Sequence, residues 1–138
     1  MRTLGLKRVH VIRLEEGDEL MSELERIASS LDIRGALVNG IGGVDRARVA
    51  VFDPEKGEYR IREVTGFHEM ASMIGNISRK ADGTIALHVH VVLGSEDEVI
   101  AGHLVEARVR GTAELFILEV DGELRRTLKK GRLTLLDV

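Results

Sequence analysis

The chain of 138 residues has no cysteine and no tryptophan, and it contains only one proline, one tyrosine and three phenylalanines. The absence of cysteine excludes a disulfide scaffold, a thiolate zinc site, an iron–sulfur centre and a cysteine nucleophile. The scarcity of aromatic rings requires an aliphatic core and leaves little with which to build platforms for base stacking. A transition-metal site in this chain must therefore use imidazole and carboxylate ligands, and there are five histidines.

Length and composition predict a single domain spanning residues 1–138, since domains of this size are the most common. Apolar residues make up 43% of the chain and charged residues 31%, a balance that allows a buried core and argues against disorder. The formal net charge is −3, so bulk electrostatics favour neither nucleic acid nor an anionic membrane as a partner.

The sequence also indicates a compartment and a source. Met1–Arg8 has no long apolar run typical of a secretory signal, and no stretch approaches the apolar length that spans a bilayer, so we expect a cytoplasmic protein without a membrane partner. The chain has no glutamine, has asparagine only at positions 39 and 76, and is rich in Glu and Arg. This bias is typical of thermophile proteins, although chance in a short chain is the alternative.

The N-terminal part of the chain predicts a strand followed by a helix. Val9 and Val11 alternate with their neighbours in the segment 7–14, as in a strand. After Gly17 the period changes, because apolar residues recur at helical spacing and form one stripe; they are Leu20, Leu24, Ile27 and Leu31. Asp18 is the predicted N-cap of this helix.

The rest of the chain predicts short strands that are separated by glycine-containing turns. They are expected at 35–41, 46–52, 58–64, 67–78, 84–93, 98–109, 112–120 and 133–136. A turn is predicted at 53–57, and Asp121-Gly122 is a typical hairpin signal. The fold class is therefore α+β, a single domain with a mostly antiparallel β-sheet and one major N-terminal helix.

Three histidines have the spacing of a metal site. His88 and His90 point to the same face of the predicted strand 84–93, because side chains alternate along a strand. If Gly94–Asp97 is the turn, the next strand runs antiparallel and places His103 across from His90. Gly102 then leaves room for a close approach of the two strands.

Three neutral imidazoles without a fourth protein ligand are typical of an open site for Zn²⁺ or a similar divalent metal. Water, a small anion or substrate would take the fourth position, and a bound water would be a potential nucleophile. The alternative is that His88 and His90 only satisfy hydrogen bonds on a polar sheet face. His10 and His68 have no comparable spacing, so core or surface roles are expected for them.

Two glutamates lie within otherwise apolar strand segments. Glu69 is the candidate catalytic residue, as a general base toward a metal-bound water or as a group that orients an imidazole. An outward-facing residue or an ion pair is the alternative for Glu69 and the preferred interpretation for Glu114. The glycine-rich segment Gly40–Gly43 enters a strand and not a helix, so a tight turn or close subunit packing explains it better than a phosphate cradle.

Three segments together resemble a known family. They are Gly66–Ile77 (GFHEMASMIGNI), Leu87–Gly94 (LHVHVVLG) and Val99–Leu104 (VIAGHL). In this order they are similar to the motifs F-E-x-x-S-x-x-G-N-I, L-H-x-H and G-G-H-L of the plant and prokaryote conserved (PPC) domain. One residue is inserted near the start of the first motif, and Ala101 replaces the first glycine of the last.

The resemblance to the PPC domain covers nearly the whole chain. It implies an α+β fold with a central antiparallel sheet, a homotrimer as in prokaryotic members, and a metal site at His88, His90 and His103. It also implies an archaeal or bacterial protein of the stand-alone type. In plants the domain accompanies AT-hooks, which contact DNA through an Arg-Gly-Arg-Pro core that this chain lacks. The basic run of this chain that is most similar to that core, Lys129–Arg132, is interpreted as a turn beside a strand.

Three functions follow from these observations. The leading prediction is a homotrimeric metal-binding domain with an open three-histidine site, whose biochemical activity the motifs do not settle. The first alternative is a DNA-associated regulator, although nucleic acid is not the favoured partner. The second alternative is a metal-dependent hydrolase or lyase that acts on a small anionic substrate, with Glu69 as general base.

Overall fold

The computed structural model describes the backbone of residues 1–130 and 133–138, and the side chains of 1–127 and 134–138. Strands dominate it, as predicted. The elements in chain order are β1 (Leu6–Glu15), α1 (Leu20–Ser30), β2 (Ala36–Asp53), β3 (Glu58–Lys80), β4 (Ile85–Gly94), β5 (Val99–Val120), β6 (Arg125–Lys130) and β7 (Leu133–Asp137).

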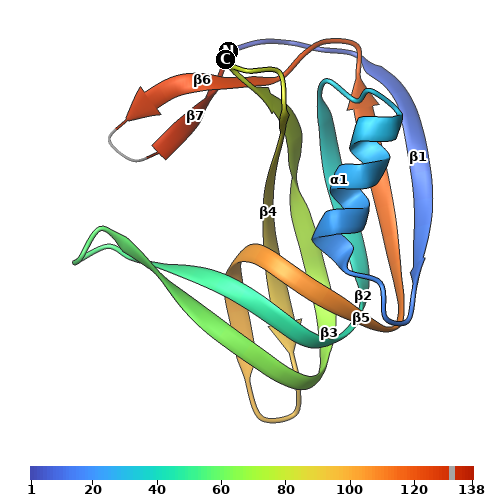
Figure 1. Ribbon diagram of the computed structural model, residues 1–138, viewed down its shortest axis with the longest axis vertical. Coiled ribbons are helices and arrows are strands. Elements are labelled where there is room, and N and C mark those ends of the chain that lie inside the picture. The colour runs from blue at the N-terminus through green and yellow to red at the C-terminus, as the bar shows by residue number, and fades with distance from the viewer. Residues whose placement is uncertain (131–132) are drawn as a thin grey trace.

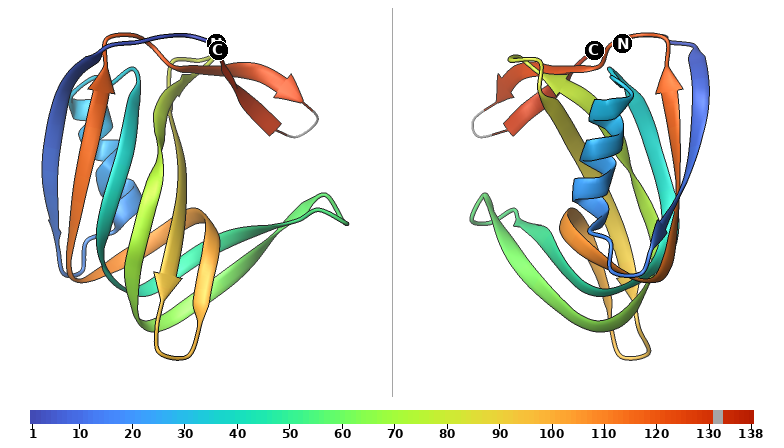
Figure 2. Two further views of the ribbon diagram at one scale, coloured as in Figure 1. Left: turned by 180° about the vertical axis from the view of Figure 1, so that it is seen from behind. Right: turned by 45° about the vertical axis from the view of Figure 1, so that its right-hand side comes forward.

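The strands form one sheet of seven strands in the order β1-β5-β2-β3-β6-β7, and β4 pairs with both β3 and β5. All pairings are antiparallel except the one between β3 and β6. Figures 1 and 2 show the sheet strongly curved, with α1 lying across one of its faces. The predicted, mainly antiparallel sheet is thus confirmed. The structure also contains the one predicted helix, but this helix is short and strands make up most of the fold.

Three pairs of predicted strands are in fact single long strands, so these boundaries were wrong. The segments 35–41 and 46–52 belong to β2, 58–64 and 67–78 to β3, and 98–109 and 112–120 to β5. The glycines between them bend the strands but do not end them. Gly66 and Gly111 have φ of 84° and 79°, a left-handed conformation that favours glycine, while hydrogen bonds to neighbouring strands continue on both sides.

The helix begins one residue later than predicted, and its N-cap is Glu19 rather than Asp18. Glu19 accepts hydrogen bonds from the backbone N–H groups of Met21 at 3.3 Å and Ser22 at 2.7 Å. Asp18 is not available because its carboxylate accepts the N–H of Glu15 at 2.9 Å and closes the preceding turn. No helix in the described part of the chain is long and apolar enough to span a membrane.

The apolar stripe of the helix is also shorter than predicted. Leu20, Leu24 and Ala28 are fully buried, whereas Leu31 is 48% exposed. The helix ends at Ser30, so Leu31 is its C-cap and no longer follows the helical period. The buried residues of the helix pack on one face of the sheet and form an aliphatic core, as the composition requires.

The hairpin predicted at Asp121-Gly122 does not form. The Asp121 backbone N–H donates to the Gly5 carbonyl at 3.0 Å, and its carboxylate accepts the Gly5 N–H at 2.8 Å. These bonds hold the segment against the N-terminus and direct β6 to the end of β3, where Arg79 and Arg125 are paired in parallel. Of the basic run 129–132, residues 131 and 132 lie outside the described residues.

Candidate metal centre

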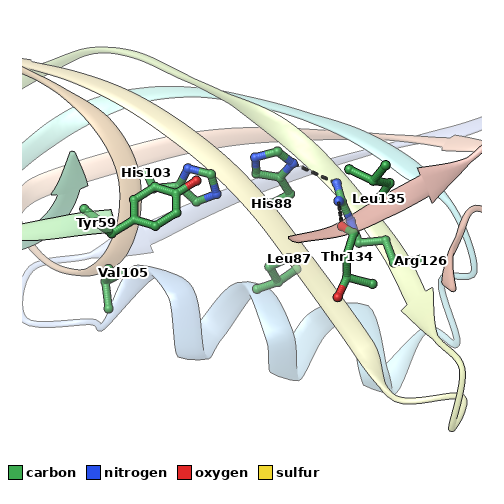
Figure 3. A pocket seen from close by; sticks show the side chains of 9 residues that line it. Tyr59, Leu87, His88, His103, Val105, Arg126, Thr134 and Leu135 are labelled. Atoms are coloured by element: carbon green, nitrogen blue, oxygen red, sulfur yellow. Dashed lines mark hydrogen bonds between the residues drawn. The ribbon is translucent and has the colours of Figure 1, made fainter. Parts of the chain in front are cut away.

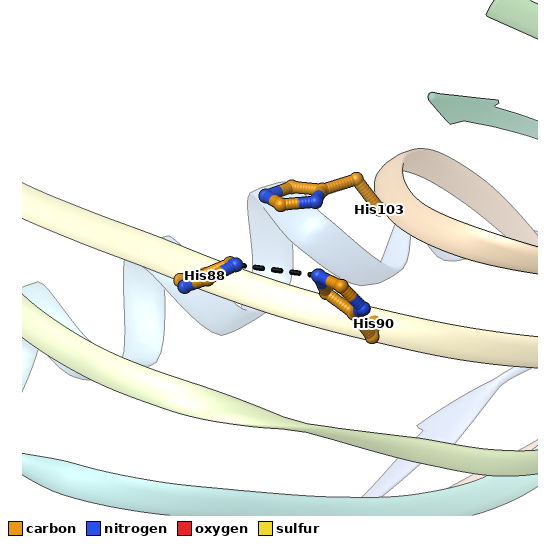
Figure 4. Close-up of side chains that lie close together, drawn as sticks. All are labelled: His88, His90 and His103. Atoms are coloured by element: carbon orange, nitrogen blue, oxygen red, sulfur yellow. Dashed lines mark hydrogen bonds between the residues drawn. The ribbon is translucent and has the colours of Figure 1, made fainter. Parts of the chain in front are cut away.

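The three histidines lie side by side on the face of the sheet that α1 does not cover (Figure 4). His88 and His90 are alternate residues of β4, whose intervening residue Val89 is buried in the core. His90 and His103 are direct partners in the β4–β5 ladder, as the turn at 94–97 predicted. β4 and β5 remain paired from Gly94 to His90 and have no further paired residues beyond it.

The spacing of the ring nitrogens fits a metal ion. The Nε2 atoms of His88 and His90 are 3.3 Å apart, and one nitrogen from each of the three rings lies within 4.8 Å of the others. Metal–nitrogen bonds of about 2.0–2.1 Å place two ligands of a tetrahedral ion about 3.3 Å apart. The three side chains therefore have the donor type and the approximate separation that a divalent ion needs, with one position left for another ligand.

Two glycines allow the strands that carry these histidines to pack closely. A Cβ atom on Gly102, which precedes His103, would lie 2.7 Å from the carbonyl oxygen of Ala50 on β2. A Cβ atom on Gly75 of β3 would lie 2.1 Å from the carbonyl oxygen of His88. Both separations are shorter than non-bonded atoms tolerate, so a side chain at either position would displace a histidine-bearing strand. A close approach at Gly102 was predicted, but between β4 and β5, whereas the structure shows it toward β2. The role of Gly75 was not predicted.

The environment favours the neutral form of two of the imidazoles, those of His88 and His103. Burial lowers the pKa of His88 to about 4, with further lowering by His103, Arg126 and His90. Burial, followed by His90 and Arg126, also lowers the pKa of His103. Both rings therefore hold a lone pair at neutral pH, and metal binding at these two rings does not have to displace a proton from an imidazolium.

Arg126 of β6 is a residue of this site that the sequence analysis missed. Its Nη2 atom donates to Nδ1 of His88 at 2.7 Å and to Oδ1 of Asn76 at 3.1 Å. Its Nε donates to Ser78 Oγ at 3.2 Å, and its Nη1 donates to the Thr134 carbonyl at 3.1 Å. Burial lowers the pKa of Arg126 as well. No local pattern marks this arginine, because only the parallel pairing of β6 with β3 brings it to the histidines.

A cavity of about 430 Å³ opens beside His88 and His103 (Figure 3). One wall comes from the β2–β3 hairpin, where the Tyr59 ring meets the His103 ring edge-on at a centroid distance of 5.4 Å. The opposite wall comes from the C-terminal hairpin of β6 and β7. The lining residues are Ala50, Tyr59, Leu87, His88, His103, Val105, Arg126, Thr134 and Leu135. Because the cavity adjoins two of the three histidines, a fourth metal ligand could enter from it.

The structure does not bring Glu69 to the histidines. Glu69 is exposed and pairs with Gly94 at the far end of β4, whereas His90 pairs with Ile74. The two pairs are five positions apart on β3 and four on β4, which is about 13–16 Å along a strand. A role of Glu69 as general base stays a prediction that the geometry of this chain does not support. Glu114 is exposed on β5, in keeping with its interpretation as an outward-facing residue.

The other two histidines lie apart from the group. His10 contacts the buried carboxylate of Glu119 at 3.2 Å. Its strand, β1, pairs with residues 112–120 of β5, whereas β4 pairs with residues 99–103 at the other end of that strand. His68 is 4% exposed, with its Nδ1 3.0 Å from the carbonyl oxygen of Gly66. Neither belongs to the metal-ligand cluster found among the described residues, in agreement with their expected core or surface roles.

Comparison with known proteins agrees with this geometry. The family model described as the Plants and Prokaryotes Conserved (PCC) domain matches residues 1–121. A plant- and prokaryote-conserved protein of Pyrococcus horikoshii is 36% identical, with a TM-score of 0.90 over 100% of this chain and 96% of its own. A metal-containing protein of Archaeoglobus fulgidus is 32% identical, with a TM-score of 0.86 over 98% of each chain.

A Bacteroides thetaiotaomicron protein that is provisionally named as DNA-binding has a TM-score of 0.87 over 99% of this chain and 98% of its own. Its identity is 23%, so this likeness extends to the fold alone. Curated proteins give no significant match. The family model, the two more identical relatives and the three-histidine geometry lead to one conclusion: the chain belongs to the plant and prokaryote conserved domain family.

Proposed function

We propose that this protein binds one divalent metal ion per chain, Zn²⁺ or a similar ion, through His88, His90 and His103. The observation that carries the proposal is the convergence of three ring nitrogens within 4.8 Å of one another. The 3.3 Å separation of two of them, which matches a tetrahedral ligand edge, supports it further. The metal-containing relative from Archaeoglobus fulgidus, 32% identical over almost the whole chain, has the same fold.

The surroundings of the site favour an open metal centre over a closed structural one. No fourth Cys, His, Asp or Glu joins the cluster among the described residues, while the cavity beside it has room for a small molecule. A bound divalent ion would polarise a ligand or lower the pKa of a water molecule in this position. This supports the candidate activity of a metal-dependent hydrolase or lyase with a small anionic substrate. Leu87 and Val105 would limit the access of bulk water.

We also propose that the chain assembles with copies of itself, as the trimer that the family resemblance implies. The support is an apolar patch on the sheet face opposite α1, which we call the outer patch. It spans β1, β5, β2 and β3, which are adjacent in the sheet. Its large residues are each at least 42% exposed; they are Val9, Val11, Leu37, Ile41, Ile74 and Phe116. Such a patch, on the order of 500 Å², is at the upper end for a monomer and is typical of an interface.

A DNA-associated role is the less supported candidate. The net charge of −3 and the near absence of aromatic residues oppose autonomous binding to nucleic acid. Binding of duplex DNA at physiological ionic strength, with an affinity that falls steeply as salt rises, would favour it over the metal-dependent role.

Elemental analysis of protein purified without chelators tests the metal site directly. We expect close to one equivalent of metal per chain. The double variant His88→Ala/His90→Ala should contain almost none, while the His10→Ala variant, which alters a histidine outside the cluster, should retain the full amount. Absence of metal from the unmodified protein, both as purified and after incubation with Zn²⁺, would refute the proposal.

A further inference from the structure

Among the described residues, no acidic side chain pairs with the positive charge of Arg126. Its side chain is half-buried between β3 and β7, and it forms no salt bridge with a described carboxylate. Arg79, a more deeply buried arginine on the neighbouring strand β3, differs in this respect, because its guanidinium forms a salt bridge with Asp32 at 2.8 Å. Buried charges are normally paired, so the surroundings of Arg126 lack a counter-ion that those of Arg79 contain.

The described lining of the cavity beside Arg126 likewise contains a positive charge without an acidic side chain to balance it. No Asp or Glu occurs among the described residues that line it, and the two histidines of the lining bind a metal as neutral imidazoles. Arg126 is therefore the single charged group of the cavity wall as described. A divalent ion on the three histidines would raise the positive charge further. The cavity is thus electrostatically suited to an anion.

The hydrogen bonds of Arg126 show how an anion could be bound. A guanidinium has five N–H donors. Three of them are held by Ser78, Asn76 and the Thr134 carbonyl, which fix the plane of the group. A fourth donates to Nδ1 of His88, and one N–H of Nη1 has no partner among the described residues.

The bond between Arg126 and His88 is incompatible with metal binding through the opposite nitrogen of the ring. A guanidinium only donates, so Nδ1 of His88 must carry the lone pair and Nε2 must carry the proton. Coordination through Nε2, the atom that faces His90, needs the lone pair on Nε2 and the proton on Nδ1. A protonated Nδ1 cannot accept from Arg126. Exchange with solvent moves the proton from Nε2 to Nδ1 without a net change in charge, and Arg126 loses this acceptor.

From these observations we propose that Arg126 is the anion-binding residue of the site and selects a small carboxylic acid as ligand. When His88 binds metal through Nε2, the Nη2 N–H released from His88 and the uncommitted N–H of Nη1 bind the carboxylate. The apolar remainder of the acid lies against Leu87, Val105 and Leu135. This inference rests on the proposed metal site and names the ligand class of that site.

The planar guanidinium fits this role better than a lysine would, because its donors match the two oxygens of a carboxylate. A cavity of about 430 Å³ has room for an acid of a few carbon atoms. The shared contact with His88 also couples the two ligands. A carboxylate that binds Arg126 removes the competition for His88, so the acid and the metal strengthen each other's binding by the same factor.

Calorimetric titration with Zn²⁺, in the presence and absence of isovalerate, tests this proposal. Isovalerate provides a carboxylate with a short apolar body, and isovaleramide is the uncharged control. We expect isovalerate to raise the zinc affinity of the unmodified protein about tenfold and isovaleramide to have no effect. Nitrogen NMR of the His88 ring should show the proton on Nε2 without metal and on Nδ1 with Zn²⁺.

Variants of Arg126 separate its role from a structural one. R126Q and R126K should still bind one Zn²⁺ but lose the effect of isovalerate, and R126Q alone should bind Zn²⁺ at least as tightly as the unmodified protein does without acid. The control R125Q alters an exposed arginine of the same strand, which pairs with Glu123 at 2.9 Å, and should keep the full effect. Circular dichroism verifies that each variant is folded.

The outcomes distinguish this inference from the metal site on which it rests. If the unmodified protein binds one Zn²⁺ and isovalerate does not change the affinity, the metal site stands and the role of Arg126 is refuted. Retention of the isovalerate effect in R126Q, or an equal effect of isovaleramide, also refutes it. If no Zn²⁺ binds to the unmodified protein, both proposals fail together.

Discussion

The two faces of strand β4 have opposite properties although their residues alternate along one segment. Val89, Val91 and Leu93 point to the face covered by α1, and each is at most 2% exposed. His88 and His90 point to the other face, beside the cavity and in line with the outer patch. The inner face contributes burial and hence stability, whereas the outer face holds the groups that can bind a ligand. One strand therefore serves both roles, and its two faces should respond differently to substitution.

The largest effect on stability should come from the inner face. Leu93→Ala removes a fully buried side chain, and we expect the free energy of unfolding to fall by about 3 kcal/mol. Val92→Ala, a truncation at the next residue on the outer face, where the side chain is 36% exposed, should cost less than about 1 kcal/mol. Urea denaturation of the two variants measures both values. Equal costs would mean that the two faces are not distinct in burial.

The next effect concerns the outer patch. Phe116→Glu places a charge in the centre of this patch, opposite Val11 on β1, and should shift the assembly to monomers while the inner core keeps each chain folded. Light scattering coupled to size-exclusion chromatography measures the mass. The Glu114→Gln variant on the same strand is the control and should keep the mass of the unmodified protein. An unchanged mass for Phe116→Glu would exclude the outer patch as the interface.

A smaller effect is expected from the pH dependence of stability without metal. The pKa of His88 is lowered from 6.5 to about 4 in the folded chain, so the unfolded state binds more protons between these values. The neutral ring of His88 therefore contributes to the stability of the folded chain above about pH 6.5, and this contribution is lost as the pH falls toward 4. We expect a loss of about 1 kcal/mol, because solvent screens this partly exposed ring.

Urea denaturation in the presence of a chelator, repeated across this pH range, measures the loss. The His88→Asn variant, which cannot take up the proton, should show a shallower decline than the unmodified protein. Identical pH profiles would show that His88 does not link protonation to folding.

The smallest effect should follow from substitution of Glu69. Because Glu69 pairs with Gly94 rather than with a residue near the histidines, Glu69→Gln should leave metal content and zinc affinity unchanged within about twofold. A large loss would restore the predicted role of Glu69 as a group that orients an imidazole. It would require an approach to the metal that the single chain does not provide, such as a contribution from a second copy.

Local sequence patterns were sufficient to predict much of the site. Alternation along β4 placed His88 and His90 on one face, and the short turn at 94–97 placed His103 opposite His90, as the ladder confirms. Both predictions concern residues that are close together in the sequence. For such residues the geometry of a strand or a hairpin fixes how their side chains lie relative to one another. The exclusion of thiolate ligands likewise follows from composition alone.

Features that depend on distant contacts were not predicted. The N-cap is Glu19 rather than Asp18, and Glu19 also accepts the backbone N–H of Ala107, 88 residues away, at 2.8 Å. The turn signal at Asp121 was overridden by its bonds to Gly5. Arg126 reaches His88 across a sequence separation of 38 residues, through a parallel pairing that no local periodicity encodes. In each case a tertiary contact competed with a local preference or supplied a neighbour that the sequence order does not suggest.

The sequence by itself determined that this protein has an aliphatic, sheet-dominated fold and that three imidazoles, with no thiolate, form its candidate metal site. Only the tertiary structure decided what surrounds that site. These features are the cavity between the β2–β3 and β6–β7 hairpins, the charge of Arg126, which pairs with no carboxylate among the described residues, and the distance between Glu69 and the histidines. The physical reason is that side-chain alternation and short turns act over a few residues. The curvature of the sheet and the position of the last hairpin result from packing across the whole chain.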